Sequence, residues 1–412
     1  MDVNQATREV ERRLEDLKQF TSTHGNGCTR LPFSKETRDA AEYLKEEMRQ
    51  AGLEVREDTV GNVIGVLPGR DRTKPAIVNG SHYDSVYNGG NYDGIAGVIV
   101  AIEIASQLNA AGIQLERDYV VVAFMDEEGC RFGTGYFGSK SILGQMTVEE
   151  CKHFTDKDGI SVYSAMRDYG LVPEKIPEAA WAPDRIGYYV EAHIEQGPVL
   201  DAKGLEIGLV NGIVGIQRYM FNVHGRSDHA GTTPMDMRKD SVDAATKVIS
   251  KIADFAREAG KGTVATVGYV NAVPGGMNVV AQSMEFSVDI RSMDNDIIND
   301  IADKIRACLK EETEKIGGSY DEDVKLVIEP CALNDGMLDL METSCKEHGY
   351  SYMRLPSGAG HDALAVGQIN PNTVMVFVPS KEGRSHCPEE YTPYEYFGKA
   401  VQVMFDLIVN LK

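Results

Sequence analysis

The chain has 412 residues, of which 42% are hydrophobic and 25% charged, and its 42 basic and 63 acidic side chains give a net charge of −21. This length predicts more than one domain, and the composition is typical of a globular protein with a sizeable core. The negative field would repel phosphate backbones and anionic lipid, so we expect neither a nucleic acid nor a membrane as partner. An anionic substrate would need a cationic pocket of its own.

The sequence contains no apolar run of about 18 residues, so we predict no transmembrane helix. The segment Met1–Gln5 has neither the basic nor the apolar part of a secretory leader. The seven cysteines form no C-x-x-C pair, which favours reduced thiols. We therefore expect a cytoplasmic protein.

Helices and strands alternate over the first third of the chain. The elements expected there are helix 5–21, a helix capped by Ser34 and ended by Gly52, strands 53–58, 62–67 and 76–79, helix 97–108 and strand 119–124. The apolar runs 76–79 and 119–124 are typical of buried central strands. This alternation predicts an α/β domain, in which helices cover the faces of a sheet.

The next segment, 141–185, is mixed in character and contains Pro173, Pro177 and Pro183. It favours a helical excursion and then a loop, after which residues 188–192 return as a strand.

A second domain is predicted between residues 212 and 327. Its elements are strand 217–224, helix 240–258, strands 264–271 and 284–290, helix 295–316 and strand 324–329. The order β-α-β-β-α-β is that of a ferredoxin-like unit. The α/β pattern then resumes with helix 335–348, strand 373–378 and helix 394–411. We therefore predict a discontinuous catalytic domain, 1–211 and 328–412, with an inserted lid domain, 212–327.

Candidate metal ligands stand where the predicted strands end, because loops converge there while the sheet holds them rigid. The residues singled out are His82, Asp93, Glu128, His193 and His386. Asp93 follows a glycine-rich turn, and a carboxylate there can bridge two cations with one oxygen for each. In the spacing H-x-D, Asp84 can reach the far ring nitrogen of His82 and fix its tautomer.

Glu127 immediately precedes Glu128, and adjacent side chains point in different directions. One can therefore bind metal while the other faces the substrate as a general base. Each motif alone is more often a surface turn or a solvated acidic pair, but their conjunction predicts a two-metal site. Imidazole and carboxylate ligands without thiolate suit zinc, manganese, cobalt or nickel.

The chain also carries a set of longer motifs. They are Gly80–Ser85 (GSHYDS), Asn88–Gly94 (NGGNYDG), Glu127–Phe132 (EEGCRF), Ala192–Pro198 (AHIEQGP), Ser227–Pro234 (SDHAGTTP), Gly358–Asp362 (GAGHD) and Ser385–His386. With these motifs the chain resembles the M20 metallopeptidase superfamily over nearly its whole length. The resemblance is closest to the amidohydrolase branch of N-carbamoyl-L-amino-acid hydrolases, β-ureidopropionases and allantoate amidohydrolases.

The resemblance implies that Asp93 bridges two divalent ions in each subunit. His82 and His193 would complete one metal site, and Glu128 and His386 would complete the other. His193 stands where the family's peptidases usually carry a carboxylate, and this argues against a generic aminopeptidase.

Catalytic and substrate-binding roles are implied in the same way. Glu127 would be the general base, and His229 would polarise the scissile carbonyl. Further substrate residues would be Gln196, Gln217, Asn278, Arg291, Gly358, Ala359 and Gly360. Arg291 would supply a forked cation for an acidic substrate. The alternatives are that Arg291 is a simple surface charge and that His229 caps its own turn.

Two stretches depart from the family pattern, at Tyr87 and at Ala281–Gln282. They lie beside the predicted site and leave the choice of substrate open.

We therefore expect a metal-dependent amidohydrolase that cleaves the ureido or carbamoyl C–N bond of a small carboxylate, first of all an N-carbamoyl-L-amino acid. The alternatives are allantoate or a ureidoglycolate-type substrate, then a dipeptidase or aminopeptidase activity, and last a non-catalytic metal-binding homologue. The resemblance also implies a homodimer formed through the inserted domain.

Overall fold

The computed structural model describes residues 1–411, which form two compact units. Unit 1 comprises Met1–Asn211 together with the chain from Leu333 onward, and unit 2 comprises Gly212–Ala332. The second break thus lies at Ala332, where the sequence analysis places it at 327. Within the described residues, no helix has the length and apolar content needed to cross a membrane.

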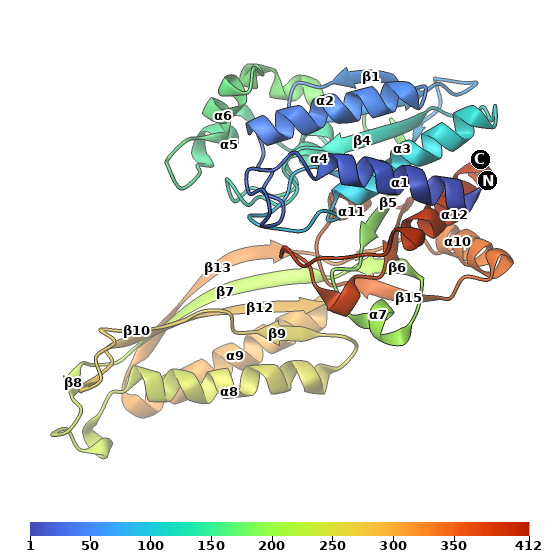
Figure 1. Cartoon of the computed structure of the whole chain (residues 1–412). Helices are drawn as coiled ribbons and strands as arrows, with labels where there is room; N and C mark the ends of the chain where they lie inside the picture. Colours follow the sequence, from blue (N-terminus) through green and yellow to red (C-terminus); the bar gives the residue numbers. More distant parts are fainter. Residues whose placement is uncertain (412) are drawn as a thin grey trace. The chain divides into compact units, whose positions relative to one another are not determined.

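Unit 1 is built on a mixed sheet in the order β1-β2-β4-β3-β5-β16-β6, with β15 also paired to β6. The strands are β1 (Glu54–Glu57), β2 (Val63–Leu67), β3 (Ala76–His82), β4 (Tyr119–Phe124), β5 (Ile186–Ile194), β6 (Ile207–Ile213), β15 (Tyr352–Ser357) and β16 (Thr373–Val378). The four central strands β4, β3, β5 and β16 run parallel to one another, so their carboxyl ends meet at one edge of the sheet. Figure 1 shows the order of these elements along the chain.

One helical layer covers one face of this sheet. Its helices are α1 (Val3–Leu17), α2 (Lys35–Gln50), α3 (Ile95–Ala110), α10 (Asp335–His348) and α12 (Tyr394–Asn410). The core beneath them takes alternate residues of the strands, such as Val63 of β2 and Val121 and Ala123 of β4. Because successive strand residues point to opposite faces, Val120 and Val122 point to the other face.

Shorter elements complete unit 1. They are α4 (Phe137–Ile142), α5 (Val148–His153), α6 (Val162–Asp168), the 3₁₀ turns η1 (Pro173–Ala179) and η3 (Lys381–Gly383), α7 (Val199–Lys203) and α11 (Asp362–Gly367). Helices α5 and α6 and the turn η1 form the helical excursion that the sequence predicts between 141 and 185, whereas α4 lies almost wholly before it. The sequence does not predict the strands β6 and β15, which lie towards one edge of the sheet, or the short helices α7 and α11.

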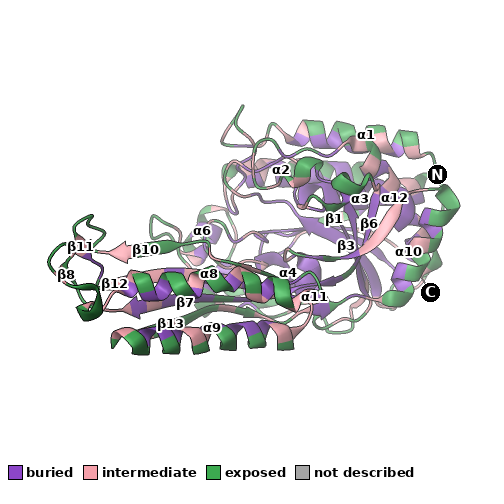
Figure 2. Ribbon diagram, turned by 90° about the horizontal axis from the view of Figure 1, so that it is seen from below, coloured by how far each residue is buried: buried purple, intermediate pink, exposed green. Residues whose placement is uncertain are grey.

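Unit 2 contains a five-stranded antiparallel sheet and two longer helices. Its elements are β7 (Gly215–His224), β8 (Asp228–His229), η2 (Met235–Met237), α8 (Ser241–Ala259), β9 (Val264–Thr266), β10 (Val270–Val273), β11 (Val279–Val280), β12 (Ser283–Ser292), α9 (Asn295–Ile316) and β13 (Ser319–Ile328). The order β10-β12-β7-β13 is ferredoxin-like, as the sequence predicts. The helices α8 and α9 pack side by side, and Figure 2 shows their alternating buried and exposed faces.

The single strand predicted over 264–271 is wrong, because it is two short strands. Thr266 of β9 pairs with Asp289, whereas Val270 of β10 pairs with Phe286. The chain advances four residues from Thr266 to Val270 while β12 advances three from Phe286 to Asp289. One extra residue on one strand is the mark of a β-bulge. Gly268 lies in this interruption.

A short strand pair lies where the chain enters and leaves unit 2. Cys331 of β14 (Cys331–Ala332) pairs with Ile213, and Ala332 pairs with Gly212. The two crossings, which are the points at Gly212 and Ala332 where the chain passes between the units, are therefore neighbours.

Candidate metal centre

The predicted ligands come from the carboxyl ends of the four parallel strands. His82 is the last residue of β3, His193 lies near the end of β5, and Glu128 follows β4. His386 follows β16, and Asp93 lies in the loop between β3 and α3. The sequence analysis ended the first of these strands near Asn79, but β3 continues to His82, because its last residues pair with β4.

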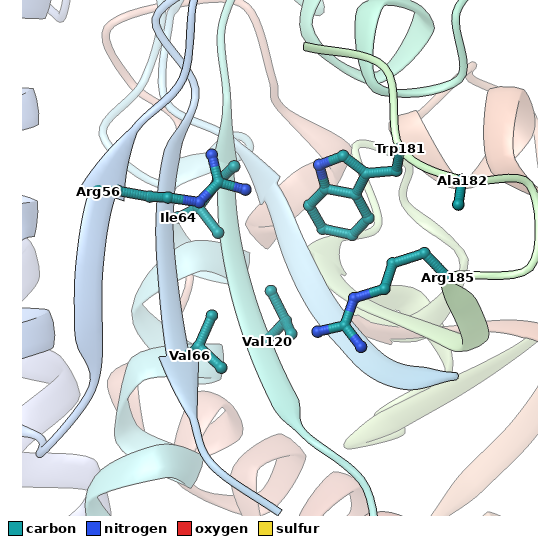
Figure 3. Close-up of a pocket in the computed structure, with 7 residues that line it drawn as sticks. All are labelled: Arg56, Ile64, Val66, Val120, Trp181, Ala182 and Arg185. Atoms are coloured by element: carbon teal, nitrogen blue, oxygen red, sulfur yellow. The ribbon is translucent and has the colours of Figure 1, made fainter. Parts of the chain in front are cut away.

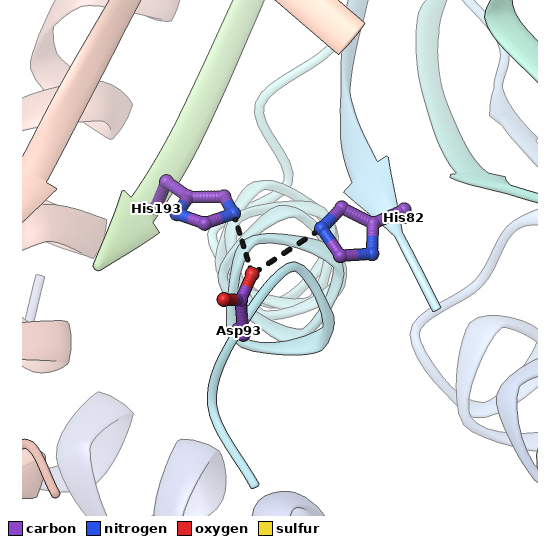
Figure 4. A group of neighbouring side chains, drawn as sticks. All are labelled: His82, Asp93 and His193. Atoms are coloured by element: carbon purple, nitrogen blue, oxygen red, sulfur yellow. Dashed lines mark ion pairs between the residues drawn. The ribbon is translucent and has the colours of Figure 1, made fainter. Parts of the chain in front are cut away.

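Asp93 lies at the centre of two groups of possible ligands. Its Oδ1 atom is 3.2 Å from His193 Nε2 and 3.4 Å from His82 Nε2 (Figure 4). Its Oδ2 atom is 3.3 Å from His386 Nε2, which is itself 3.4 Å from Glu128 Oε1. In each group the ligand atoms lie within 4.8 Å of one another.

The oxygens of this cluster fit a metal ion. Asp93 Oδ1 and Glu128 Oε1 are buried and have no hydrogen-bond partner among residues 1–411. Buried polar atoms are rarely left in this state, because the lost hydration is costly. Both oxygens face imidazole nitrogens, and a divalent cation held between oxygen and nitrogen would satisfy them all.

The buried rings of His82 and His193 are each oriented by a contact of the Nδ1 atom, on the side of the ring away from Asp93. His193 Nδ1 donates to the carbonyl of Ile194 at 2.9 Å. His82 Nδ1 lies 3.2 Å from the carbonyl oxygen of Asp84 and 3.5 Å from its Oδ1 atom. A proton held on Nδ1 leaves Nε2 of each ring with a lone pair towards Asp93, which is the tautomer that binds metal.

Asp84 also connects the GSHYDS and EEGCRF motifs of the sequence. Its carboxylate accepts hydrogen bonds from the backbone N–H of Glu127 at 3.1 Å and of Glu128 at 3.4 Å. It therefore orients the turn that carries the candidate general base.

Glu127 has the environment of a proton acceptor. Its side chain is 8% exposed, and its Oε2 atom is 3.8 Å from His82 Nε2. Burial raises the pKa of Glu127 well above the ordinary value, and the neighbouring Glu128 and Asp362 raise it further. Such a carboxyl group can hold a proton near neutral pH.

Without metal, His386 and Glu128 bind protons more tightly than these groups ordinarily do. The hydrogen-bonding contact with Asp93 raises the pKa of His386 to about 9. Burial raises the pKa of Glu128 to about 7. A cation that binds here displaces such protons.

Glu390 belongs to the site, and the sequence analysis missed it. The side chain is 4% exposed, and its Oε1 atom accepts from the N–H of Tyr92 at 3.0 Å and of Asp93 at 3.2 Å. Its Oε2 atom accepts from Ser385 Oγ at 2.9 Å. Glu390 thus joins the loop of Asp93 to the loop of His386. A Cβ atom at Gly90 would lie 1.9 Å from Glu390 Oε1. The glycine-rich turn was therefore the only feature of the sequence that could have indicated a close neighbour at this position.

His361, from the GAGHD motif, packs behind a predicted ligand. Its ring is 4.5 Å from that of His193, and its Nε2 atom is 2.8 Å from Ser357 Oγ. Burial lowers the pKa of His361 well below the ordinary value, so the ring is neutral and supports His193 by packing.

The predicted substrate residues of unit 1 differ in their surroundings. Gln196 Nε2 donates to Asp93 Oδ2 at 2.7 Å, so this amide lies at the metal cluster. The N–H of Ala359 already donates to Ser357 Oγ at 3.1 Å. A Cβ atom at Gly360 would collide with the hydroxyl of Tyr136.

The predicted substrate residues of unit 2 form two separate pairs. Gln217 and Arg291 are near neighbours, because Ile290 pairs with Gln217 across β7 and β12. His229 pairs with Val279 across β8 and β11, next to Asn278. The pairs lie at opposite ends of β7, whose stretch from Gln217 to His224 spans about 24 Å. One small substrate cannot contact both pairs in the same copy of unit 2.

The ring of His229 has a defined tautomer. Its Nδ1 atom accepts from the N–H of Gly231 at 3.0 Å and of Thr232 at 3.2 Å. A neutral ring then carries its proton on Nε2, where it can donate to an oxyanion.

The guanidinium of Arg291 and the amide of Gln217 are both engaged. Arg291 Nε donates to Asp289 Oδ1 at 2.7 Å, and Asp289 also binds Arg218 at 2.6 Å. Gln217 Nε2 donates to Asn299 Oδ1 at 3.0 Å. A substrate carboxylate would therefore share Arg291 with Asp289.

Comparison with known proteins gives consistent results. The model of the peptidase family M20/M25/M40 matches residues 76–410. The N-carbamoyl-L-amino-acid amidohydrolase of Paenarthrobacter aurescens is 38% identical over 98% of this chain and 97% of its own. The allantoate amidohydrolase of Bacillus subtilis (strain 168) is 34% identical over 97% and 96%. The crystal structure of an amidase of the hydantoinase/carbamoylase family from Burkholderia multivorans has a TM-score of 0.90 at 29% identity and covers 98% of this chain and 97% of its own.

Proposed function

The chain belongs to the M20/M25/M40 peptidase family and is a hydrolase of C–N bonds, and from this premise we propose that its substrate is an N-carbamoyl-L-amino acid. The observation that carries the hydrolytic centre is the cluster of three imidazoles and the carboxylate of Glu128 around Asp93, with Glu127 beside it. Relatives named for hydrolysis of carbamoyl amino acids, matched over nearly the whole chain, support this choice.

We propose two divalent ions, zinc or manganese, with Asp93 between them. His82 and His193 would complete one set of ligands, and Glu128 and His386 the other. When bound, the ions would lower the pKa of water and polarise the scissile carbonyl. The buried oxygens of Asp93 and Glu128 support this arrangement.

Glu127 performs the proton transfers in this mechanism. It takes a proton from the attacking water and returns it to the nitrogen that leaves the carbonyl carbon. The free amino acid departs, and the remaining carbamate decomposes to ammonia and carbon dioxide. His229, with its proton on Nε2, donates to the developing oxyanion.

Substrate recognition falls to the residues around this centre. Arg291 would bind the substrate carboxylate as a fork, assisted by Gln217 and Asn278. Gln196 and the loop of Gly358, Ala359 and Gly360 would line the same pocket.

We further propose a cytoplasmic homodimer that is paired through unit 2. The separation of the His229 pair from the Gln217 pair supports it, because a small substrate needs the two pairs from two different copies. The two ends of unit 2 would then serve the sites of different subunits.

The test is ammonia release by the metal-loaded protein from a substrate panel. N-carbamoyl-L-amino acids, N-carbamoyl-β-alanine, allantoate, ureidoglycolate and dipeptides (followed as released amino acid) are compared by kcat/KM. We expect the highest value for an N-carbamoyl-L-amino acid. A higher value for allantoate would favour the second candidate, for which relatives named allantoate amidohydrolase speak.

A further inference from the structure

A cavity with a volume of about 220 Å³ lies in unit 1, away from the metal cluster. It is lined by Arg56, Ile64, Val66, Val120, Trp181, Ala182 and Arg185 (Figure 3). Val120 stands near the start of β4, and Arg185 immediately precedes β5, whereas the candidate ligands lie at or beyond the carboxyl ends of these strands. At the rise of a β-strand, the cavity and the acidic turn at Glu127 are roughly 20 Å apart. The cavity is therefore distinct from the catalytic site.

The floor of the cavity is apolar and is fixed by strand register. Arg56 pairs with Ile64 across β1 and β2, and Val66 pairs with Val120 across β2 and β4. Residues that pair in this way share a face of the sheet. It is the face opposite the helical layer, because the alternate residues Val63 and Val121 belong to the core beneath α3.

The walls supply hydrogen-bond donors and no acid. In Figure 3 the side chains of Arg56, Trp181 and Arg185 converge on the strip of β2 and β4 that carries the floor. A guanidinium and an indole N–H donate only. In a chain with 63 acidic and 42 basic side chains, a lining with two arginines and no carboxylate is unexpected.

The nearby acids are already bound. Asp118 Oδ2 accepts from Arg185 Nη2 at 2.7 Å, and Glu54 binds Arg72 at 2.9 Å. Arg185 is therefore held in place by a buried carboxylate. Arg56, by contrast, makes no ion pair with any residue between 1 and 411, although its charge partly offsets the rise that burial causes in the pKa of the nearby Asp58. Its guanidinium can therefore still bind a ligand.

Trp181 stands between this cavity and a second one. The second cavity has a volume of about 300 Å³ and shares Trp181 and Ala182 with the first. The backbone N–H of Trp181 donates to the carbonyl of Ile142 at 2.8 Å, which fixes the base of the side chain. Trp181 therefore lines both cavities, and an indole offers a flat apolar surface on which another ring can stack.

We propose that this cavity is a second ligand site, which binds a small organic anion with a flat apolar body. The carboxylate would lie against Arg56, and the body would lie between Trp181 and the partly exposed Val66, above the covered side chains of Ile64 and Val120. The volume limits the ligand to about the size of one aromatic amino acid. A free amino acid is excluded, because no acidic group lines the cavity to bind its ammonium group.

The experiment uses the chain's one tryptophan as reporter. Intrinsic fluorescence is titrated with phenylacetate, and with 2-phenylethanol and 2-phenylethylamine as neutral and cationic molecules of similar body. We expect a saturable change with phenylacetate and little with the other two. Arg56→Gln should raise the Kd for phenylacetate about tenfold, the effect of losing one charged hydrogen bond.

Two controls separate this site from the catalytic centre. Arg49→Gln, at an exposed arginine of α2 that approaches Glu46 only to 3.5 Å, should leave the Kd unchanged. Arg56→Gln should keep the kcat/KM of the wild type without phenylacetate, and removal of metal should leave the phenylacetate titration unchanged. Absence of a saturable signal, equal affinity in the two arginine variants, or loss of the signal with the metal would overturn the proposal.

Discussion

At the scale of single residues, the site depends on carboxylates that are buried beside one another. Asp84, Asp93, Glu127 and Glu390 are all less than one tenth exposed. Each of these carboxylates has different partners, and the partners determine its role. Asp93 is a proposed metal ligand, Glu127 the proposed general base, and Asp84 and Glu390 position their neighbours. The residue type alone does not make this distinction.

Glu127→Gln separates proton transfer from metal binding. The amide has the same shape but cannot accept a proton, so we expect kcat to fall by about 10²- to 10⁴-fold while the metal content stays unchanged. Metal content is measured by atomic emission and turnover by ammonia release. Glu149→Gln, at an exposed glutamate that is paired with Lys152, serves as the control. Turnover that survives with metal in place would remove Glu127 as the base.

Glu390→Ala should weaken metal binding, although Glu390 is no ligand. It would free the backbone of Asp93 and the hydroxyl of Ser385, and losses of such supporting contacts cost about 10- to 100-fold in metal affinity. Gly90→Ala should act in the same way, because its Cβ atom would displace the Glu390 carboxylate. Glu390→Gln should lose less, since its amide oxygen still accepts from the backbone.

The matched control for these variants is the neighbouring residue. Glu389 is exposed and binds Arg384 at 2.9 Å. Metal retention is measured by dialysis against graded chelator. If Glu389→Gln and Glu390→Ala retained metal equally, the supporting role of Glu390 would be wrong.

Asp58 gives a pH dependence of stability that is independent of the metal ligands. Its carboxylate is buried beneath the loop that precedes β2, and burial raises its pKa from 3.8 to about 6. The folded protein thus binds this proton more tightly than the unfolded chain. The stabilisation is complete below the unfolded value and is lost as the pH rises through 6, by on the order of 3 kcal/mol.

Asp58→Asn should remove this contribution. The difference in urea midpoint between wild type and variant should therefore change between pH 4 and 7, with the wild type losing stability relative to the variant as pH rises. Asp71→Asn is the control, because hydrogen bonds from Thr73 lower the pKa of Asp71, so that its contribution to stability changes mainly below this pH range. A constant difference for Asp58→Asn across this range would contradict the assignment.

At the scale of elements, local signals predicted some segments fully and others not at all. Helices α9 and α10 were predicted to the residue, since Asp294 and Asn334 cap their starts and Gly317 and Gly349 end them. The strand β15 was missed, because Arg354 and Pro356 interrupt its apolar pattern. The extension of β3 to His82 was missed because Gly80 and Ser81 are poor strand formers, and only pairing with β4 holds them there.

The same distinction applies to the site. The predicted ligands follow apolar runs, so their spacing was visible in the sequence. Glu390 contacts Asp93 across 297 residues of chain, and no local pattern reports such a contact. The pairing of Arg291 with Asp289 was also unseen, because two charges at i and i+2 on a strand give no sign of whether they meet.

The capping box of α2 offers a test at this scale. Ser34 accepts from the N–H of Thr37, and the Thr37 hydroxyl accepts from the N–H of Ser34. Ser34→Ala should destabilise the protein by about 1 kcal/mol and leave metal binding unchanged. The measurement is the urea midpoint, with Ser22→Ala, at a loop serine, for comparison. An unchanged midpoint for Ser34→Ala would mean that the cap contributes nothing.

At the scale of the whole molecule, the two units divide the work. All predicted metal ligands belong to unit 1, and His229, Gln217, Asn278 and Arg291 belong to unit 2. Since unit 2 presents its residues at two distant ends, the proposed activity requires more than one copy of the chain.

Mixed subunits test this requirement. His229→Ala and Glu127→Gln should each be inactive alone. Co-expressed in equal amounts, they should recover about a quarter of the wild-type activity if His229 serves the other subunit, because half of the dimers are mixed and each has one intact site. The oligomeric state is measured in parallel by light scattering. A dimer without recovered activity would mean that His229 serves its own subunit.

The paired crossings at Gly212 and Ala332 have a consequence for how such a chain can change over time. Partners in an antiparallel pair lie about 5 Å apart. Unit 2 therefore begins and ends at neighbouring residues, as an insertion in a β-hairpin loop does. Its length and sequence can drift, or a different insert can replace it, without moving any strand that carries a metal ligand. The metal ligands and the proposed substrate residues of unit 2 therefore lie on parts of the gene that can evolve at separate rates.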